Sequence, residues 1–158
     1  MRYSLDHAQS AESALSAYWN NAIPVDPVII AKAMGVSVYS SKSIDYCGEF
    51  FIQNKKPTIL YKPSGKTQED RFVIAHELGH FVLHHTGMKK DQISSFKIDI
   101  PDSNEREANE FAINLLTPES AVRFAVRKAG LTSVEKLSSY FDAYETVVRF
   151  RLKSAGLI

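Results

Sequence analysis

The sequence predicts an α+β protein in which a small antiparallel sheet packs on helices and an all-helical part follows. Three observations support this fold class: two short apolar segments flank a polar turn, a long and mostly apolar helix follows them, and only helical patterns occur after residue 117. With 158 residues, the chain can bury a core without disulfides or a structural metal. We therefore expect a core of residues 1–116 and a C-terminal helical extension, residues 117–158, packed on it.

The first part of the chain supplies two helices and the strands of the sheet. Residues 11–20 carry an apolar stripe at helical spacing. Asp26 before Pro27 is typical of a helix start, and Gly35 is placed to end that second helix. The polar turn at residues 54–57 joins two apolar segments into a β-hairpin. The predicted strands comprise residues 36–39, 49–52 and 58–61.

The second part of the chain begins with the long helix. Thr67, with Asp70 three residues later, resembles a capping box at its start, and Gly87 is expected to end it. Residues 96–100 alternate like an edge strand, to which an extended substrate peptide could add. Asp102 is expected to cap the next helix. The remaining predicted helices comprise residues 103–116, 118–129, 133–141 and 145–155.

Composition and charge argue against several classes of protein. A net charge of +1 with 23% charged residues argues against binding driven by a polyanion. The single cysteine, Cys47, excludes an internal disulfide and fits a reducing cytoplasm. The N-terminal residues lack the apolar segment of a secretion signal, and no segment approaches the ~20 apolar residues of a membrane span. We therefore expect a soluble, cytoplasmic protein.

The long helix carries the pentapeptide His76-Glu77-Leu78-Gly79-His80. Residues four apart lie on one face of an α-helix, so His76 and His80 can bind one metal ion together. Glu77 lies beside that face, where its carboxylate can accept a proton from water instead of binding the ion. This HExxH pattern is typical of zinc metalloproteases, and it predicts a Zn²⁺ cofactor.

A catalytic zinc ion usually has three protein ligands, so a third ligand is expected elsewhere. His84 shares a face with the two motif histidines, but three ligands along one straight helix span about 12 Å, too far to meet at one ion. We therefore predict that His84 supports the site from outside the ligand shell or packs in the core. On the following helix, Glu105 lies at the edge of the apolar stripe, whereas Glu107 and Glu110 point away toward solvent. Glu105 is the predicted third ligand, and Asn109, one turn later, is predicted to hydrogen-bond a ligand histidine.

Two segments of the sequence resemble a known family. RFVIAHELGHFVLHH and EREANEFAINLLTP are similar to the HExxH helix and the later ExxxN helix of the ImmA/IrrE metallo-endopeptidases, and the resemblance covers most of the chain. The resemblance implies His76, His80 and Glu105 as zinc ligands, Glu77 as the catalytic base, and a gluzincin-like fold. It also implies a protein substrate, which in several members is a helix-turn-helix transcriptional repressor.

The predicted function is hydrolysis of a peptide bond in a protein substrate. Glu77 would take a proton from the attacking water and pass it to the leaving amine. The group that stabilises the tetrahedral oxyanion is left open among Tyr46, Tyr61 and His84, each of which carries a suitable donor.

Two alternative functions compete with this prediction. Residues 137–152 read as helix, turn and helix, and a DNA-binding regulator could use Arg149, Arg151 and Lys153 for phosphate contacts. The near-zero net charge favours a packed helical hairpin instead, so DNA binding is not expected. The other alternative is a zinc-sensing protein without peptidase activity, in which Cys47 is a conceivable fourth ligand, although a small buried residue is the better interpretation of that cysteine.

Overall fold

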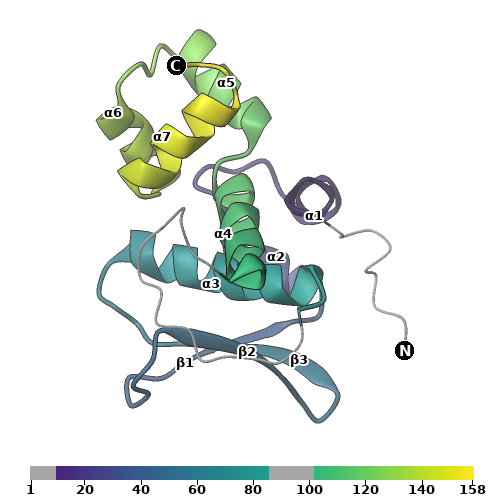
Figure 1. Cartoon of the computed structure of the whole chain (residues 1–158). Helices are drawn as coiled ribbons and strands as arrows, with labels where there is room; N and C mark the ends of the chain where they lie inside the picture. The colour runs from purple at the N-terminus through teal and green to yellow at the C-terminus, as the bar shows by residue number, and fades with distance from the viewer. Residues whose placement is uncertain (1–9, 86–101) are drawn as a thin grey trace.

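The structure is a computed structural model that describes residues 10–85 and 102–158, and it confirms the predicted α+β fold. In chain order the elements are α1 (Ala11–Tyr18), α2 (Pro27–Ala33), β1 (Ser37–Ser40), β2 (Gly48–Gln53), β3 (Lys56–Tyr61), α3 (Thr67–Val82), α4 (Ser103–Leu116), α5 (Glu119–Arg127), α6 (Val134–Phe141) and α7 (Glu145–Ser154). Among the described residues, a three-stranded sheet lies beneath α3, α4 crosses α3, and α5, α6 and α7 gather near the C-terminus (Figure 1). No helix in these two described ranges is both long and apolar enough to cross a membrane.

The sheet is mixed, with the strand order β1-β3-β2 in the described part of the chain. β2 and β3 form the predicted antiparallel hairpin, in which Gly48 pairs with Tyr61. β1 instead pairs with β3 in parallel, with Ser37 opposite Thr58, so the expectation of a wholly antiparallel sheet is wrong for this strand. β3 takes the central place because it is the most buried of the three strands, and pairing on both sides satisfies its backbone there.

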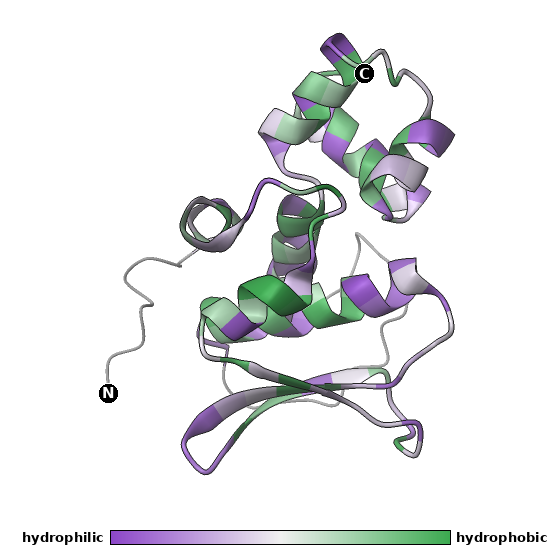
Figure 2. Ribbon diagram, turned by 180° about the vertical axis from the view of Figure 1, so that it is seen from behind, coloured by the Kyte–Doolittle hydropathy of each residue, from purple (hydrophilic) through white to green (hydrophobic). Residues whose placement is uncertain are grey.

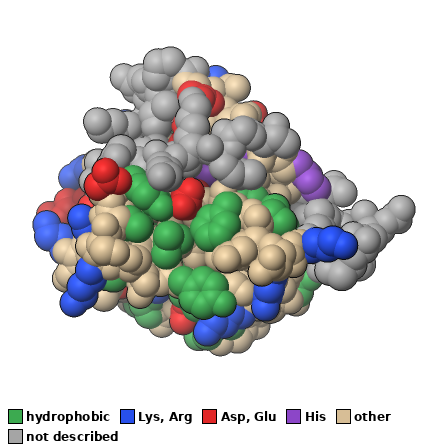
Figure 3. Space-filling model, turned by 90° about the horizontal axis from the view of Figure 1, so that it is seen from below, with side chains coloured by type: hydrophobic (Ala, Val, Ile, Leu, Met, Phe, Trp, Pro, Cys, Tyr) green, Lys and Arg blue, Asp and Glu red, His purple; other side chains and the backbone are tan. Residues whose placement is uncertain are grey.

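One face of the sheet is covered by α3, and no other described helix or strand covers the opposite, open face (Figure 1). Phe50 of β2 and Ile59 of β3 are buried in the main core cluster, and the ring of Phe50 lies 5.4 Å from that of Phe81 on α3. The open face, toward the viewer in Figure 3, shows apolar side chains scattered between charged ones. The sheet therefore buries α3 from below.

The helix α3 is buried along most of its length, from Phe72 to Val82. In Figure 2 the first turn of α3 is hydrophilic, whereas its later, buried turns are largely hydrophobic. α4 crosses α3 so closely that a Cβ atom on Gly79 would lie 3.1 Å from the side chain of Phe111. The glycine inside the HELGH segment therefore permits the close approach of the two helices that carry the predicted ligands.

A second apolar cluster joins α5, α6 and α7 to the end of α4. Its buried members include Ile113 of α4, Leu137 and Phe141 of α6 and Val148 of α7. Ile113 precedes the predicted boundary, so α4 contributes to this cluster as well as to the core around α3. The division of the chain at residue 117 stays a prediction.

Arg71 on α3 connects the core to the C-terminal helices. Its guanidinium donates hydrogen bonds to the carbonyl oxygens of Val25 and Asp142, and it lies 3.5 Å from the Asp142 carboxylate. Burial lowers the pKa of Arg71, and the neighbouring carboxylates of Asp142 and Asp26 oppose that shift. One side chain therefore ties α3 to both the loop before α2 and the end of α6.

Two sequence expectations concern the segment between α3 and α4. The edge strand predicted at residues 96–100 lies outside the described residues. The predicted helix end at Gly87 is wrong, because α3 ends at Val82 and Leu83 caps it. This early end changes the surroundings of His76 and His80.

Candidate metal centre

The structure brings His76, His80 and Glu105 together in the interior. All three are buried, and one ligand atom from each lies within 4.8 Å of the others. The Nε2 atom of His76 lies 2.9 Å from a Glu105 carboxylate oxygen, and that of His80 lies 3.2 Å from the other oxygen. The two Nε2 atoms are 3.1 Å apart. Two imidazoles and one carboxylate from separate helices thus point at one small volume.

The donor set and its spacing fit a zinc ion. Ligand atoms bound to one tetrahedral zinc at about 2.0–2.1 Å lie about 3.3 Å from one another, close to the separations observed here. Imidazole nitrogen and carboxylate oxygen are both ordinary zinc ligands, and three protein ligands leave a position open for water or substrate. The metal-binding role of these residues remains a proposal that rests on this fit.

Glu105 reaches the site because of how α4 begins. The side chain of Asp102 accepts hydrogen bonds from the backbone N–H groups of Asn104 and Glu105, so the helix starts where the sequence predicts. This cap fixes Glu105 in the first turn, facing α3. Glu107 and Glu110 are exposed, as expected from their positions relative to the apolar stripe.

Asn109 and Phe72 hold the ring of His76. Asn109 is buried, and its Oδ1 atom lies 2.8 Å from Nδ1 of His76. Because an amide oxygen only accepts, His76 carries its proton on Nδ1 and presents the lone pair of Nε2 to the centre. The ring of Phe72 stacks on the same imidazole at a centroid distance of 6.3 Å. The predicted contact between Asn109 and a motif histidine is therefore present in the structure.

The chain reverses direction directly after α3, and this places His84 and His85 differently from the sequence expectation. The N–H of His84 bonds to the carbonyl of Phe81 at 3.2 Å, and the N–H of His85 bonds to that of His80 at 3.0 Å. These two bonds form a Schellman motif, with His84 in the left-handed conformation at φ +60°. His84 is exposed, so its predicted role beside the ligands is wrong. His85 takes that place, with Nδ1 lying 2.8 Å from Nδ1 of His80.

The left-handed conformation of His84 predicts a stabilising substitution. His84→Gly should raise the free energy of unfolding by about 0.5–1 kcal/mol, because relief of the Cβ clash outweighs the larger backbone entropy that glycine loses on folding. A denaturant titration of the metal-free protein measures this change. His84→Ala is the matched control, since it removes the imidazole but keeps Cβ, and it should bring no gain; a loss of stability in His84→Gly would contradict the prediction.

Glu77 of α3 packs against the start of β2. Its side chain is fully buried, and a Cβ atom on Gly48 would lie 3.4 Å from Cγ of Glu77 and 2.7 Å from Cγ1 of Val73. The backbone of β2 therefore rests directly on the helix at the proposed catalytic carboxylate. Only glycine fits at this point without displacing one of the two side chains.

This contact predicts that Gly48→Ala destabilises the protein by about 1–3 kcal/mol, the usual cost of overpacking a close contact. Val73 and Glu77 must shift to make room for the added methyl group. The double variant Gly48→Ala with Val73→Ala removes the Cγ1 atom that causes the closest clash. Denaturation should therefore show less destabilisation than the sum of the single changes, and simple additivity would contradict the steric account.

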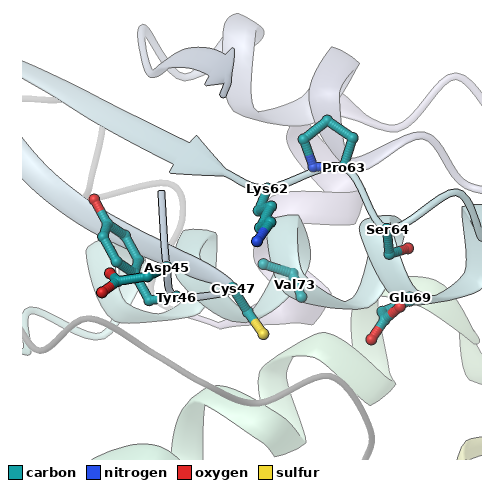
Figure 4. Close-up of a pocket in the computed structure, with 8 residues that line it drawn as sticks. All are labelled: Asp45, Tyr46, Cys47, Lys62, Pro63, Ser64, Glu69 and Val73. Atoms are coloured by element: carbon teal, nitrogen blue, oxygen red, sulfur yellow. The ribbon is translucent and has the colours of Figure 1, made fainter. Parts of the chain in front are cut away.

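A pocket of about 350 Å³ opens beside this contact (Figure 4). Its walls come from three segments: the residues before β2, the residues after β3 and the first half of α3. Cys47 points into the pocket, so it lines this cavity and is not part of the ligand cluster found among the described residues. The lining residues are Asp45, Tyr46, Cys47, Lys62, Pro63, Ser64, Glu69 and Val73.

The two tyrosines considered as oxyanion donors stay protonated at neutral pH. The hydroxyl of Tyr46 donates a hydrogen bond to Glu49 at 2.6 Å, and this bond, with burial and nearby carboxylates, raises the pKa of Tyr46 to about 12. Burial raises the pKa of Tyr61. The hydroxyl of Tyr46 already donates its hydrogen bond to Glu49, so it would have to change partner before it could stabilise an oxyanion.

Comparison with known proteins finds a matching family and a similar metallopeptidase. Residues 31–153 match the model of a peptidase family, M78, described as the IrrE N-terminal-like domain. A relative, the metallopeptidase ImmA of Bacillus subtilis (strain 168), is 30% identical over 94 residues, which cover 56% of this chain and 52% of the relative. The match thus spans about half the length of that relative.

Proposed function

The chain belongs to the IrrE N-terminal-like family of metallopeptidases, and on that premise we propose that it is a zinc-dependent endopeptidase. The observation that carries the proposal is the buried convergence of His76, His80 and Glu105, with the buried Glu77 directly after His76 on α3. A purely structural zinc site is usually closed by four protein ligands, whereas three ligands next to a buried acid are typical of a hydrolytic site.

In this proposal the three ligands hold the metal, and the surrounding residues orient them. A zinc ion in this place supplies Lewis-acid chemistry, since it acidifies water and polarises a carbonyl group. Asn109 keeps the proton of His76 on Nδ1, which leaves Nε2 as a ligand atom. The carboxylate of Glu105 offsets part of the cation's charge in a largely buried site.

Glu77 acts as the general base and then as the general acid. It follows the first ligand histidine on α3, so its carboxylate lies beside the ligand face without sharing it. From there it takes a proton from the attacking water and gives it to the leaving amine when the peptide bond breaks. β2 packs on its stem through Gly48, which fixes the side chain at the edge of the sheet.

The pocket beside β2 is the proposed place for a substrate side chain. Val73 lies one helical turn before Glu77 and forms part of the pocket wall, so a residue bound there sits next to the proposed base. A volume of about 350 Å³ accommodates a large side chain. The substrate we propose is a helix-turn-helix transcriptional repressor, in line with the family resemblance.

The proposal is tested by incubating the purified zinc-loaded protein with a candidate helix-turn-helix repressor and following cleavage on a gel. A cut made by the parent chain and absent with Glu77→Gln supports the activity and the partner together. A parent that binds zinc but cleaves neither the repressor nor an unfolded protein substrate would leave the zinc-sensing alternative in place.

The structure argues against one of the three phosphate contacts that a DNA-binding regulator would use, the contact of Arg151. Arg151 is buried, and its Nε atom donates to the carbonyl oxygen of Thr117 at 2.7 Å. Its guanidinium therefore joins α7 to the end of α4 and does not face a DNA backbone. We retain peptide hydrolysis as the proposed function.

A further inference from the structure

We propose that His85 and Glu107 act as a hydrogen-bonded pair that positions His80 for the metal. The inference rests on the proposed function, because it treats His80 as a zinc ligand. Three side chains form a continuous row: Nδ1 of His80 lies 2.8 Å from Nδ1 of His85, and Nε2 of His85 lies 3.0 Å from a carboxylate oxygen of Glu107. Neither His85 nor Glu107 has a place in the HExxH pattern.

The direction of the hydrogen bonds follows from the chemistry at the two ends of the row. A carboxylate only accepts, so His85 carries its proton on Nε2 and donates it to Glu107. Nδ1 of His85 is then an acceptor, and the contact with His80 requires the proton of His80 to sit on Nδ1. That tautomer leaves the lone pair of His80 Nε2 directed at the centre. Glu107 therefore selects, through His85, the form of His80 that can bind a metal.

The fold brings the pair together from two elements. The Schellman turn after α3 returns the backbone of His85 to the carbonyl of His80, which lays one imidazole against the other at a centroid distance of 5.0 Å. Glu107 comes from the second turn of α4, which crosses α3 there. The side chain of His85 is only 8% exposed, while that of Glu107 is 55% exposed. His85 thus fills the space between a buried ligand and a carboxylate at the surface.

The two ligand histidines are oriented independently. His76 is held by Asn109, a buried neutral amide, whereas His80 is held by the imidazole of His85. Loss of the pair should therefore affect His80 alone and weaken metal binding without removing a ligand. Partners of this kind typically change metal affinity by about 10- to 100-fold.

The test is the zinc affinity of the full chain, measured by competition with a chromogenic chelator. His85→Phe replaces the imidazole with another aromatic ring that has no nitrogen atoms. Zinc affinity should then fall by about 10- to 100-fold. His85→Gln offers an amide oxygen that can accept the Nδ1 proton of His80, so it should recover part of this loss. His84→Asn is the matched control, because it removes the neighbouring exposed imidazole. Asparagine tolerates the left-handed conformation of this position, so the variant should bind zinc like the parent.

The result that overturns the proposal is a folded His85→Phe, checked by circular dichroism, that binds zinc as tightly as the parent. If His85→Phe does not fold, the test uses Glu107→Ala, because the exposed side chain of Glu107 can be removed without disturbing the core. A several-fold weaker zinc affinity of this variant supports the pair, and an unchanged affinity overturns the proposal. Zinc affinity and peptide cleavage are measured on the same samples. A parent that binds zinc without cleaving refutes the proposed peptidase and leaves the pair intact.

Discussion

Replacement of Glu77 by glutamine is expected to abolish peptide-bond hydrolysis while zinc stays bound. The amide has the shape of the carboxylate, so the packing against Gly48 is kept. It cannot accept a proton at neutral pH, and a positioned general base contributes about 10²- to 10⁴-fold to the rate. The value of kcat/KM should therefore fall by at least this factor, which is the largest effect on the chemical step expected from any single change.

The measurement combines two readings on one preparation: zinc content after dialysis, and the initial rate of cleavage of a protein substrate. Glu110→Gln is the matched control, because it makes the same chemical change at an exposed position of α4. It should leave both readings unchanged. Full activity in Glu77→Gln would remove the proposed mechanism, whereas loss of zinc together with activity would mean that Glu77 supports the ligands instead of the proton transfer.

The local part of the site could be predicted from the sequence because it depends on helix geometry. The spacing of His76 and His80 fixes their common face, and Asp102 fixes the start of α4 and hence the direction of Glu105. The cap at Asp102 is formed as predicted, and α4 spans Ser103–Leu116, the predicted residues. These features need only neighbouring residues, so periodicity and capping rules suffice.

The parts that depend on distant contacts could not be predicted in the same way. β3 lies between β1 and β2 in the described sheet and pairs in parallel with β1, and no local pattern of the sequence marks this order or direction. The place of His85 could not be predicted because Gly87 indicates a longer helix, whereas the chain turns at His84, a non-glycine residue in the left-handed conformation. A signal was present in principle, since the residue two positions after a Schellman cap commonly contacts the last turn of its helix.

The second large effect is expected at Glu105, where glutamine should weaken zinc binding by more than the 10- to 100-fold typical of residues outside the ligand shell. The substitution removes the only anionic group among the three proposed ligands and leaves a neutral amide of similar shape beside two imidazoles. Peptide hydrolysis should be lost with the metal at ordinary zinc concentrations.

The same substitution at three positions of α4 separates the roles of its glutamates. Glu105→Gln should bind zinc most weakly. Glu107→Gln should be close to the parent, because its amide oxygen can still accept from His85, and Glu110→Gln should match the parent. Chelator competition ranks the three variants directly. An affinity of Glu105→Gln equal to that of Glu110→Gln would show that this carboxylate does not bind the metal, and since only two histidines would then hold it, the hydrolytic site would need a different third ligand.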